Sequence, residues 1–290
     1  MSSFVRITLC FCLNEPIKFQ SFSGYSVRGL FYNIIKNIDE EYAINLHNSK
    51  TLAPFSTSPI LIEKNNEVYP CFNKVERGLA KINFVLLEDK LINLIIKFIQ
   101  EKIGTIEIKL GENKLFLNSI SLENISFEKI YEQSNEIKSF KINFLTPTYF
   151  RLTPKDIEEK YKKKINIKVS PYRFLPLPDP ILFFRSIARL WRKFSKYDLN
   201  LESFLEWINL GGIALSGYPD GIKTHIVYEH PTTKKWSVGF TGKVHFSLVK
   251  DLFDSKKAKI ADTLLKFAEY TNVGGGRTAG LGMIKYEIEK

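Results

Sequence analysis

The chain has 290 residues, 44% of them hydrophobic and 25% charged, which is an ordinary globular composition and excludes a disordered or fibrous protein. At about 150 residues per domain, this length predicts two domains. No apolar run reaches the ~18 residues of a membrane span, and the N-terminal segment does not have the pattern of a signal peptide. The three cysteines, Cys10, Cys12 and Cys71, are too few for a disulfide framework, so we expect a reduced, cytoplasmic protein with no membrane association.

The charge is strongly positive, because 42 Lys and Arg residues face 31 Asp and Glu residues for a net charge of +11. Such an excess favours a polyanionic partner, although solubility alone is a sufficient reason for many basic proteins. The acidic residues are scattered, whereas basic residues gather at 162–164 and at Arg185, Arg189, Arg192, Lys193 and Lys196.

The first half of the chain alternates between strand and helix patterns. Apolar residues at every second position predict a strand over Val5–Leu13, and an apolar stripe at helical spacing predicts a helix over Val27–Ile38. The same criteria predict strands at Ser58–Ile62, Glu67–Cys71 and Lys81–Leu87, a helix at Asp89–Glu101, and strands at Thr105–Leu110, Lys114–Ser119 and Lys138–Leu145.

The second half repeats this order of elements. The predicted elements are a strand at Lys164–Val169, a helix after Pro178-Asp179, a short helix at Glu202–Ile208, strands at Gly212–Leu215, Thr224–Val227 and Trp236–Phe246, a helix at Ala258–Tyr270, and a strand at Met283–Ile288. We therefore predict an α+β fold of two tandem ferredoxin-like (RRM-like, βαββαβ) domains. Because Pro147 interrupts a strand pattern, we place the boundary there, with one domain at 1–145 and the other at 146–290.

The segment Gly274–Gly282 contains five glycines in nine residues: Gly274, Gly275, Gly276, Gly280 and Gly282. Glycine leaves backbone N–H groups open to a phosphate, and Arg277 adds a planar fork of donors. A dinucleotide-binding fingerprint is excluded because the segment follows a helix and only a few residues remain after it; a P-loop is excluded because no Gly-Lys-Ser/Thr occurs. A flexible connection needs fewer glycines, so we favour contact with a phosphate backbone.

A second cluster of polar residues lies near the first predicted helix. His47 follows that helix in a polar segment, where a general acid or base is well placed on a loop. Arg28, Tyr32 and Lys36 share a second helix face at i, i+4 and i+8, which could present two cations and a phenol to an anion. The plain alternative is a solvated histidine beside a tyrosine that packs at the rim. We expect no metal site, since His225, His230 and His245 lack suitable spacing and have no cysteine nearby.

Four segments together resemble the CRISPR repeat-processing endoribonuclease family of the repeat-associated mysterious protein superfamily. They are LHNS at Leu46–Ser49, LTPT at Leu145–Thr148, PDP leading into FFRS at Pro178–Ser186, and GGGRTAGLG at Gly274–Gly282. The glycine segment is specific to the superfamily, and the ordered combination is specific to the family. The resemblance implies two ferredoxin-like domains and metal-independent cleavage of precursor CRISPR RNA within each repeat, with no cofactor.

The resemblance also implies a catalytic set of histidine, tyrosine and lysine, which here correspond to His47, Tyr32 and Lys50. Lys50 lies closer to the histidine than in typical members, and Arg28 or Lys36 could replace it. His47 would protonate the leaving 5′-oxygen or take the 2′-hydroxyl proton, and Tyr32 would orient or deprotonate that hydroxyl. The products would be a cyclic 2′,3′-phosphate and a 5′-hydroxyl.

The expected partner is precursor CRISPR RNA, gripped by Arg28, Lys36, Arg185, Arg189, Arg192, Arg277 and the five glycines. Delivery of guide RNA to a CRISPR effector complex follows from the resemblance, while the sequence leaves a monomer and a homodimer open. The alternative is a non-catalytic subunit that holds guide RNA, because proteins of one fold need not share activity. The position of His47 favours the enzyme, and the displaced lysine favours the alternative.

Overall fold

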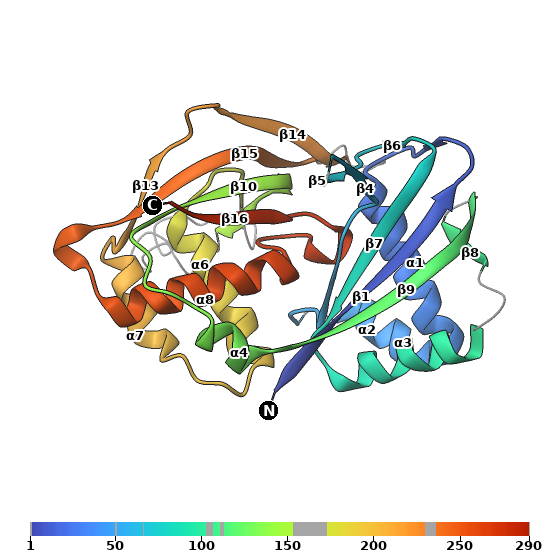
Figure 1. Ribbon diagram of the computed structural model, residues 1–290, viewed down its shortest axis with the longest axis horizontal. Coiled ribbons are helices and arrows are strands. Elements are labelled where there is room, and N and C mark those ends of the chain that lie inside the picture. Colours follow the sequence, from blue (N-terminus) through green and yellow to red (C-terminus); the bar gives the residue numbers. More distant parts are fainter. Residues whose placement is uncertain are drawn as a thin grey trace, which may run out of the picture.

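The computed structural model describes residues 2–49, 51–65, 67–102, 107–110, 113–152, 173–229 and 236–289. Two sheets, each backed by helices, lie side by side in Figure 1 and follow one another along the chain. No helix among the described residues is long and apolar enough to cross a membrane. The predicted strand at Lys164–Val169, the basic run at 162–164, Lys50 and His230 lie outside the described residues.

The first sheet is antiparallel, with the order β5-β4-β7-β1-β9-β8, and β3 also pairs with β7. Its core strands follow the order of a ferredoxin-like unit, in which β1 lies between β7 and β9 and helices follow β1 and β7. The elements are β1 (Ser3–Leu13), β2 (Ile17–Lys18), α1 (Ser23–Ile38), α2 (Glu40–Asn48), β3 (Phe55–Thr57), β4 (Leu61–Lys64), β5 (Glu67–Pro70), β6 (Lys74–Val75), β7 (Gly78–Leu86), α3 (Asp89–Lys102), β8 (Glu107–Leu110), β9 (Asn113–Ser126) and α4 (Phe127–Glu132).

The second sheet has the equivalent order β13-β15-β10-β16, and β14 pairs with β15. Helices α6 and α8 connect its strands, so the prediction of two tandem ferredoxin-like units is confirmed. The elements are β10 (Ser139–Thr148), β11 (Phe150–Leu152), β12 (Arg173–Leu175), α6 (Pro180–Phe194), α7 (Leu201–Asn209), β13 (Ile213–Gly217), β14 (Ile222–Glu229), β15 (Trp236–Leu248), η2 (Lys250–Leu252), α8 (Ser255–Thr271), η3 (Arg277–Ala279) and β16 (Ile284–Glu289).

The apolar patterns of the sequence become the buried faces of these elements. Val5, Ile7 and Leu9 of β1 point into the first core, against the stripe of α1 that includes Leu30 and Ile34. In the second domain Asp179 caps α6, because its carboxylate accepts the N–H of Leu182 at 2.7 Å. Both helices therefore bury the face that their sequences predict, and α6 begins after Asp179 as expected, whereas α1 begins at Ser23, before the predicted start at Val27.

The two domains share part of one core. Phe4, Val85 and Phe127 come from the first half of the chain, but they pack in the same apolar cluster as the helices of the second domain. The ring of Phe4 lies 5.5 Å from the rings of both Phe267 and Tyr270 on α8. This shared packing fixes the sites of the two domains relative to one another.

Pro147 lies inside β10 and not between the sheets. The strand pairs with β15 and β16 from Ser139 onward, so membership of the second sheet starts before the expected boundary at 145/146. The β10–β15 register shifts between Phe144 and Thr148, where a bulge accommodates the proline in a paired strand. The division into folding units at 1–145 and 146–290 stays a prediction, while sheet membership changes between α4 and β10.

Candidate active site

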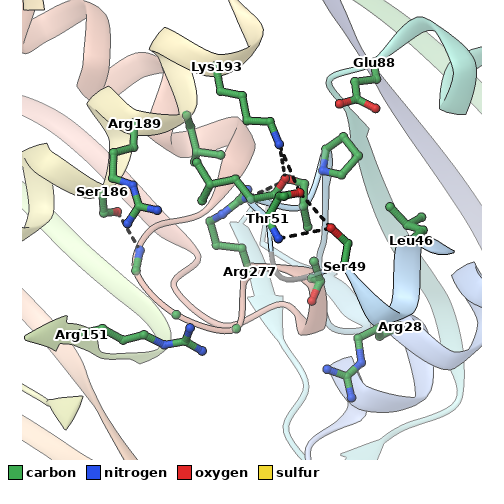
Figure 2. Close-up of a pocket in the computed structure, with 18 of the residues that line it drawn as sticks. Arg28, Leu46, Ser49, Thr51, Glu88, Arg151, Ser186, Arg189, Lys193 and Arg277 are labelled. Atoms are coloured by element: carbon green, nitrogen blue, oxygen red, sulfur yellow. Dashed lines mark hydrogen bonds between the residues drawn. The ribbon is translucent and has the colours of Figure 1, made fainter. Parts of the chain in front are cut away.

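A pocket of about 940 Å³ lies between the two domains on the helical side of the molecule. Its walls come from α1 and α2 of the first domain, and from α6, β11 and the glycine segment of the second (Figure 2). The residues Tyr32 and His47 share this pocket with Gly274, Gly275 and Gly276. Residues more than 200 positions apart in the chain are therefore brought to one site.

Helix α2 positions His47. The sequence predicts a loop there, but His47 lies in the last turn of α2, which starts at the cap residue Asp39. The Asp39 carboxylate accepts the N–H of Tyr42 at 2.8 Å, and this hydrogen bond holds the pKa of Asp39 below its usual value. The helix was missed because only Ala43 among its nine residues is buried, so no apolar stripe marks it.

Tyr32 and His47 are in contact. Their ring centroids lie 5.1 Å apart in a T-shaped arrangement, with His47 exposed and Tyr32 half-buried. Burial raises the pKa of Tyr32 although the nearby Arg28 opposes this shift. Tyr32 is therefore a neutral phenol at physiological pH and is able to donate a hydrogen bond.

Cations from both domains line the same pocket. Arg28 lies on the α1 side, and Arg189 and Lys193 lie on α6 opposite it (Figure 2). Arg185 also lines the pocket, where its guanidinium donates to Asn209 Oδ1 at 3.0 Å. Arg151 of β11 was not predicted, since it stands apart from the basic clusters of the sequence.

Helical spacing separates the basic cluster of α6 into two faces. Arg185, Arg189 and Lys193 follow each other at i, i+4 and i+8 and line the main pocket. Arg192 and Lys196 instead line a second pocket of about 380 Å³ next to the start of α7. Arg192, predicted to bind RNA together with Arg185 and Arg189, thus does not line the main pocket with them.

Lys36 is also absent from the lining of the main pocket. It forms an ion pair with Glu40 at 3.0 Å, on the exposed surface between α1 and α2. Lys36 lies one helical turn beyond Tyr32, where it contacts Glu40 and not the pocket. The predicted pair of cations around Tyr32 is therefore reduced to Arg28.

The glycine segment is a tight turn packed on the second sheet and on the first domain. A Cβ on Gly275 would lie 2.1 Å from the ring of Tyr149, so close packing requires a glycine there. Its neighbour Gly274 donates its N–H to Ser186 Oγ at 3.1 Å. Gly280 and Gly282 are buried against Pro59 and Val273 and do not line the pocket, so they shape the turn rather than present open N–H groups.

Arg277 does not present its guanidinium as an open fork. The side chain is only 6% exposed, and it donates to Thr271 O and Ala53 O, both at 3.0 Å. Burial lowers its pKa to about 10, which leaves it cationic at neutral pH. This geometry differs from the open fork expected from the sequence, because two of the guanidinium donors are directed to carbonyl oxygens, although the side chain also lines the pocket.

The described histidines of the second domain make other contacts. His225 Nε2 lies 2.8 Å from Thr241 Oγ1, and His245 Nδ1 lies 2.7 Å from Glu289 Oε1. In the described part of the chain, no group of three His, Cys, Asp or Glu side chains is arranged to hold a metal ion.

Comparison with known proteins relates this architecture to one family. The family model of the CRISPR-associated endoribonuclease Cas6 matches residues 142–284. A Cas6 product complex is 20% identical, with 99% of this chain and 100% of that chain covered, at a TM-score of 0.73. Cas6 from Thermus thermophilus is 19% identical, with 99% of each chain covered and a TM-score of 0.69. A further Cas6 product complex is 18% identical, with 98% of this chain and 99% of that chain covered and a TM-score of 0.66. At these identities the structures share the fold, and no curated protein matches the sequence.

Proposed function

Because the chain belongs to the Cas6 family of CRISPR-associated endoribonucleases, we propose that it cuts precursor CRISPR RNA within the repeats and that His47 and Tyr32 do the chemistry. The observation that carries this proposal is the contact between the two rings, 5.1 Å apart, in a pocket that also holds the glycine segment. Both residues lie outside the matched range of 142–284, so their roles rest on geometry and not on the family match.

The chemistry needs a nucleophile, proton transfer and charge stabilisation. RNA supplies the nucleophile, since the 2′-hydroxyl lies next to the phosphate that is cut. As this oxygen attacks, it gives its proton to water and forms the cyclic 2′,3′-phosphate, while the bond to the 5′-oxygen breaks and that oxygen takes up a proton and leaves as a hydroxyl. His47, exposed at the end of α2, is the residue placed to move that proton.

Because its phenol is neutral, Tyr32 has a role different from the proton transfer proposed for His47. With its pKa raised, Tyr32 donates a hydrogen bond to the 2′-hydroxyl or to a nonbridging oxygen and does not remove a proton. Arg28, on the same helix, brings a positive charge near that phosphate. Lys50 stays a proposed member of the set, with Arg28 as the cation that the described residues provide.

The opposite wall of the pocket binds the RNA backbone in this proposal. Arg185, Arg189 and Lys193 form one helix face, and Arg151 lies beside the glycine turn. These cations pair with successive phosphates, and this binding releases counterions. With the general acid and the charges supplied by side chains, the reaction proceeds without a metal or a cofactor.

The deciding experiment is single-turnover cleavage of a labelled repeat RNA in excess EDTA. We expect wild-type protein to give a cyclic 2′,3′-phosphate and a 5′-hydroxyl, and His47→Ala to cut about 10²–10⁴-fold more slowly at unchanged RNA affinity. Asn45→Ala, which changes another pocket residue of α2, is the matched control and should retain most of the rate.

Three results would contradict parts of the proposal. An undiminished rate in His47→Ala removes His47 from the mechanism, and loss of wild-type cleavage in EDTA removes the metal-free reaction. Tight binding of repeat RNA without any cleavage by the wild type identifies the chain as a guide-RNA-holding subunit. Size-exclusion chromatography with and without RNA distinguishes a monomer from a homodimer, and co-purification tests the association with an effector complex.

A further inference from the structure

The segment that follows His47 is attached to the other domain through Arg277. This segment connects α2 to β3 and is described at Ser49 and Thr51–Pro54. One arm of the Arg277 guanidinium donates to Ala53 O in it, and the other donates to Thr271 O at the end of α8, each at 3.0 Å. The side chain thus bridges the α2–β3 connection and the second domain.

Neighbouring bonds join the same parts of the two domains. Lys193 Nζ donates to Leu52 O at 2.9 Å, and Thr57 Oγ1 donates to Thr278 O at 3.0 Å (Figure 2 shows the Lys193 contact). The buried side chain of Asn272 donates from Nδ2 to Thr57 O at 2.9 Å. The glycine turn and α6 therefore hold the first domain at the residues just after His47.

This attachment matters because α2 is held only in part by its own packing, in which Tyr42 and Leu46 are partly buried against the first core. Only Ala43 of the helix is buried, and His47 is exposed in its last turn. A short helix with so few buried residues depends on tertiary contacts for its position. The contacts available beyond its C-terminal end are those of the α2–β3 connection, where Arg277 is the buried partner.

We propose that Arg277 is a positioning residue: it fixes the α2–β3 connection and thereby holds His47 against Tyr32, and it does not bind the RNA backbone. This inference rests on the proposed function only for its catalytic readout. Two donors of the Arg277 guanidinium are directed to Thr271 O and Ala53 O, and among the described residues no acidic side chain forms an ion pair with it.

The guanidinium suits this task better than an ammonium group. Two carbonyl oxygens on different elements are reached by two arms of one planar, rigid group. Lysine at this position has the charge but not the fork, so it can satisfy one carbonyl well and not both. Methionine fills similar volume and satisfies neither.

The test measures cleavage and binding separately in Arg277→Lys and Arg277→Met. The single-turnover rate at saturating protein should fall more than tenfold in Arg277→Met and less in Arg277→Lys, while the Kd for repeat RNA stays within threefold of wild type. Arg189→Met is the contrasting variant for binding, because the loss of this pocket arginine should raise the Kd. Thermal melting identifies any variant that does not fold, and Arg277→Lys then decides alone.

Hydrogen exchange provides a readout that does not depend on cleavage. A peptide covering Leu52 and Ala53 should exchange faster in each folded Arg277 variant, with β13 and β15 unchanged. A raised Kd with an unchanged rate at saturation would show that Arg277 contacts RNA and would overturn the proposal, as would unchanged exchange at Leu52 and Ala53. If the wild type does not cut repeat RNA, the proposed function fails while the exchange result still decides the role of Arg277.

Discussion

At the scale of single residues, the neutral state of Tyr32 makes a testable distinction. Tyr32→Phe removes the donor and keeps the ring that contacts His47, so the single-turnover rate should fall by about 10²–10³-fold, the usual cost of one donor to a developing negative charge. Because burial raises the pKa of Tyr32 from 10.0, its proton is retained at pH 6–9. The rates of wild type and Tyr32→Phe should therefore change in parallel with pH across this range.

A pH–rate profile on both proteins checks this, with Tyr218→Phe as an exposed control outside the pocket. If one limb of the wild-type profile is absent in Tyr32→Phe, the tyrosine acts as the base and the assignment as a donor is wrong. The sequence predicted that Tyr32 and His47 lie close together, because Tyr32 is on the first predicted helix and His47 follows that helix. It could not assign the protonation state of the phenol, which depends on burial between α1 and α2.

At the scale of elements, the cap of α2 connects local stability to the site. Asp39→Ala removes the acceptor of the Tyr42 N–H, so the protein should melt at a lower temperature and cut RNA several-fold more slowly, since α2 carries His47. The folded-state pKa of Asp39 is lowered, so its stabilisation is present above the unfolded pKa and is lost as pH falls through the folded pKa. The difference in melting temperature should persist at pH 7 and 5 and shrink below about pH 3.8.

Ser126→Ala is the matched control for this element. Ser126 caps α4 through a hydrogen bond from the N–H of Lys129 at 3.3 Å, and it carries no charge to titrate. Its loss should cost about 0.5–2 kcal/mol at every pH tested and leave the cleavage rate unchanged. A pH-independent effect of Asp39→Ala, or equal cleavage by both capping variants, would contradict the role assigned to the α2 cap.

The elements also show where sequence patterns stop being informative. Long stripes and alternations predicted β1, α1, α6 and α8 because their buried faces repeat with the period of the backbone. Helix α2 has no such face, and the two basic faces of α6 could be separated only by applying helical spacing to each cation. The acceptors of Arg277 could not be predicted, because Thr271 O and Ala53 O are brought together by tertiary contacts.

At the scale of the whole molecule, a buried carboxylate ties the second domain to the chain that leaves the first. Asp262 of α8 is fully buried and accepts hydrogen bonds from Tyr286 Oη of β16 at 2.6 Å and from the N–H of Asn135 at 2.7 Å. Lys266 Nζ lies 2.9 Å from the same carboxylate. Asn135 lies between α4 and β10, so this network stabilises the crossover between the two sheets.

Tyr286→Phe should therefore destabilise both domains by a similar amount. Loss of one hydrogen bond to a buried carboxylate costs about 1.5–3 kcal/mol, and the shared core that includes Phe4 transmits this loss to the first sheet. Urea unfolding monitored by tryptophan fluorescence reports on the second domain, because Trp191, Trp207 and Trp236 all belong to it, and hydrogen exchange of β1 reports on the first. Both probes should report the same decrease in the free energy of unfolding. The urea curve should show one transition with an unchanged m-value. Protection of β1 that matches wild type while the fluorescence midpoint falls would show that the domains unfold independently, and the pocket between them would then depend on two separate stabilities.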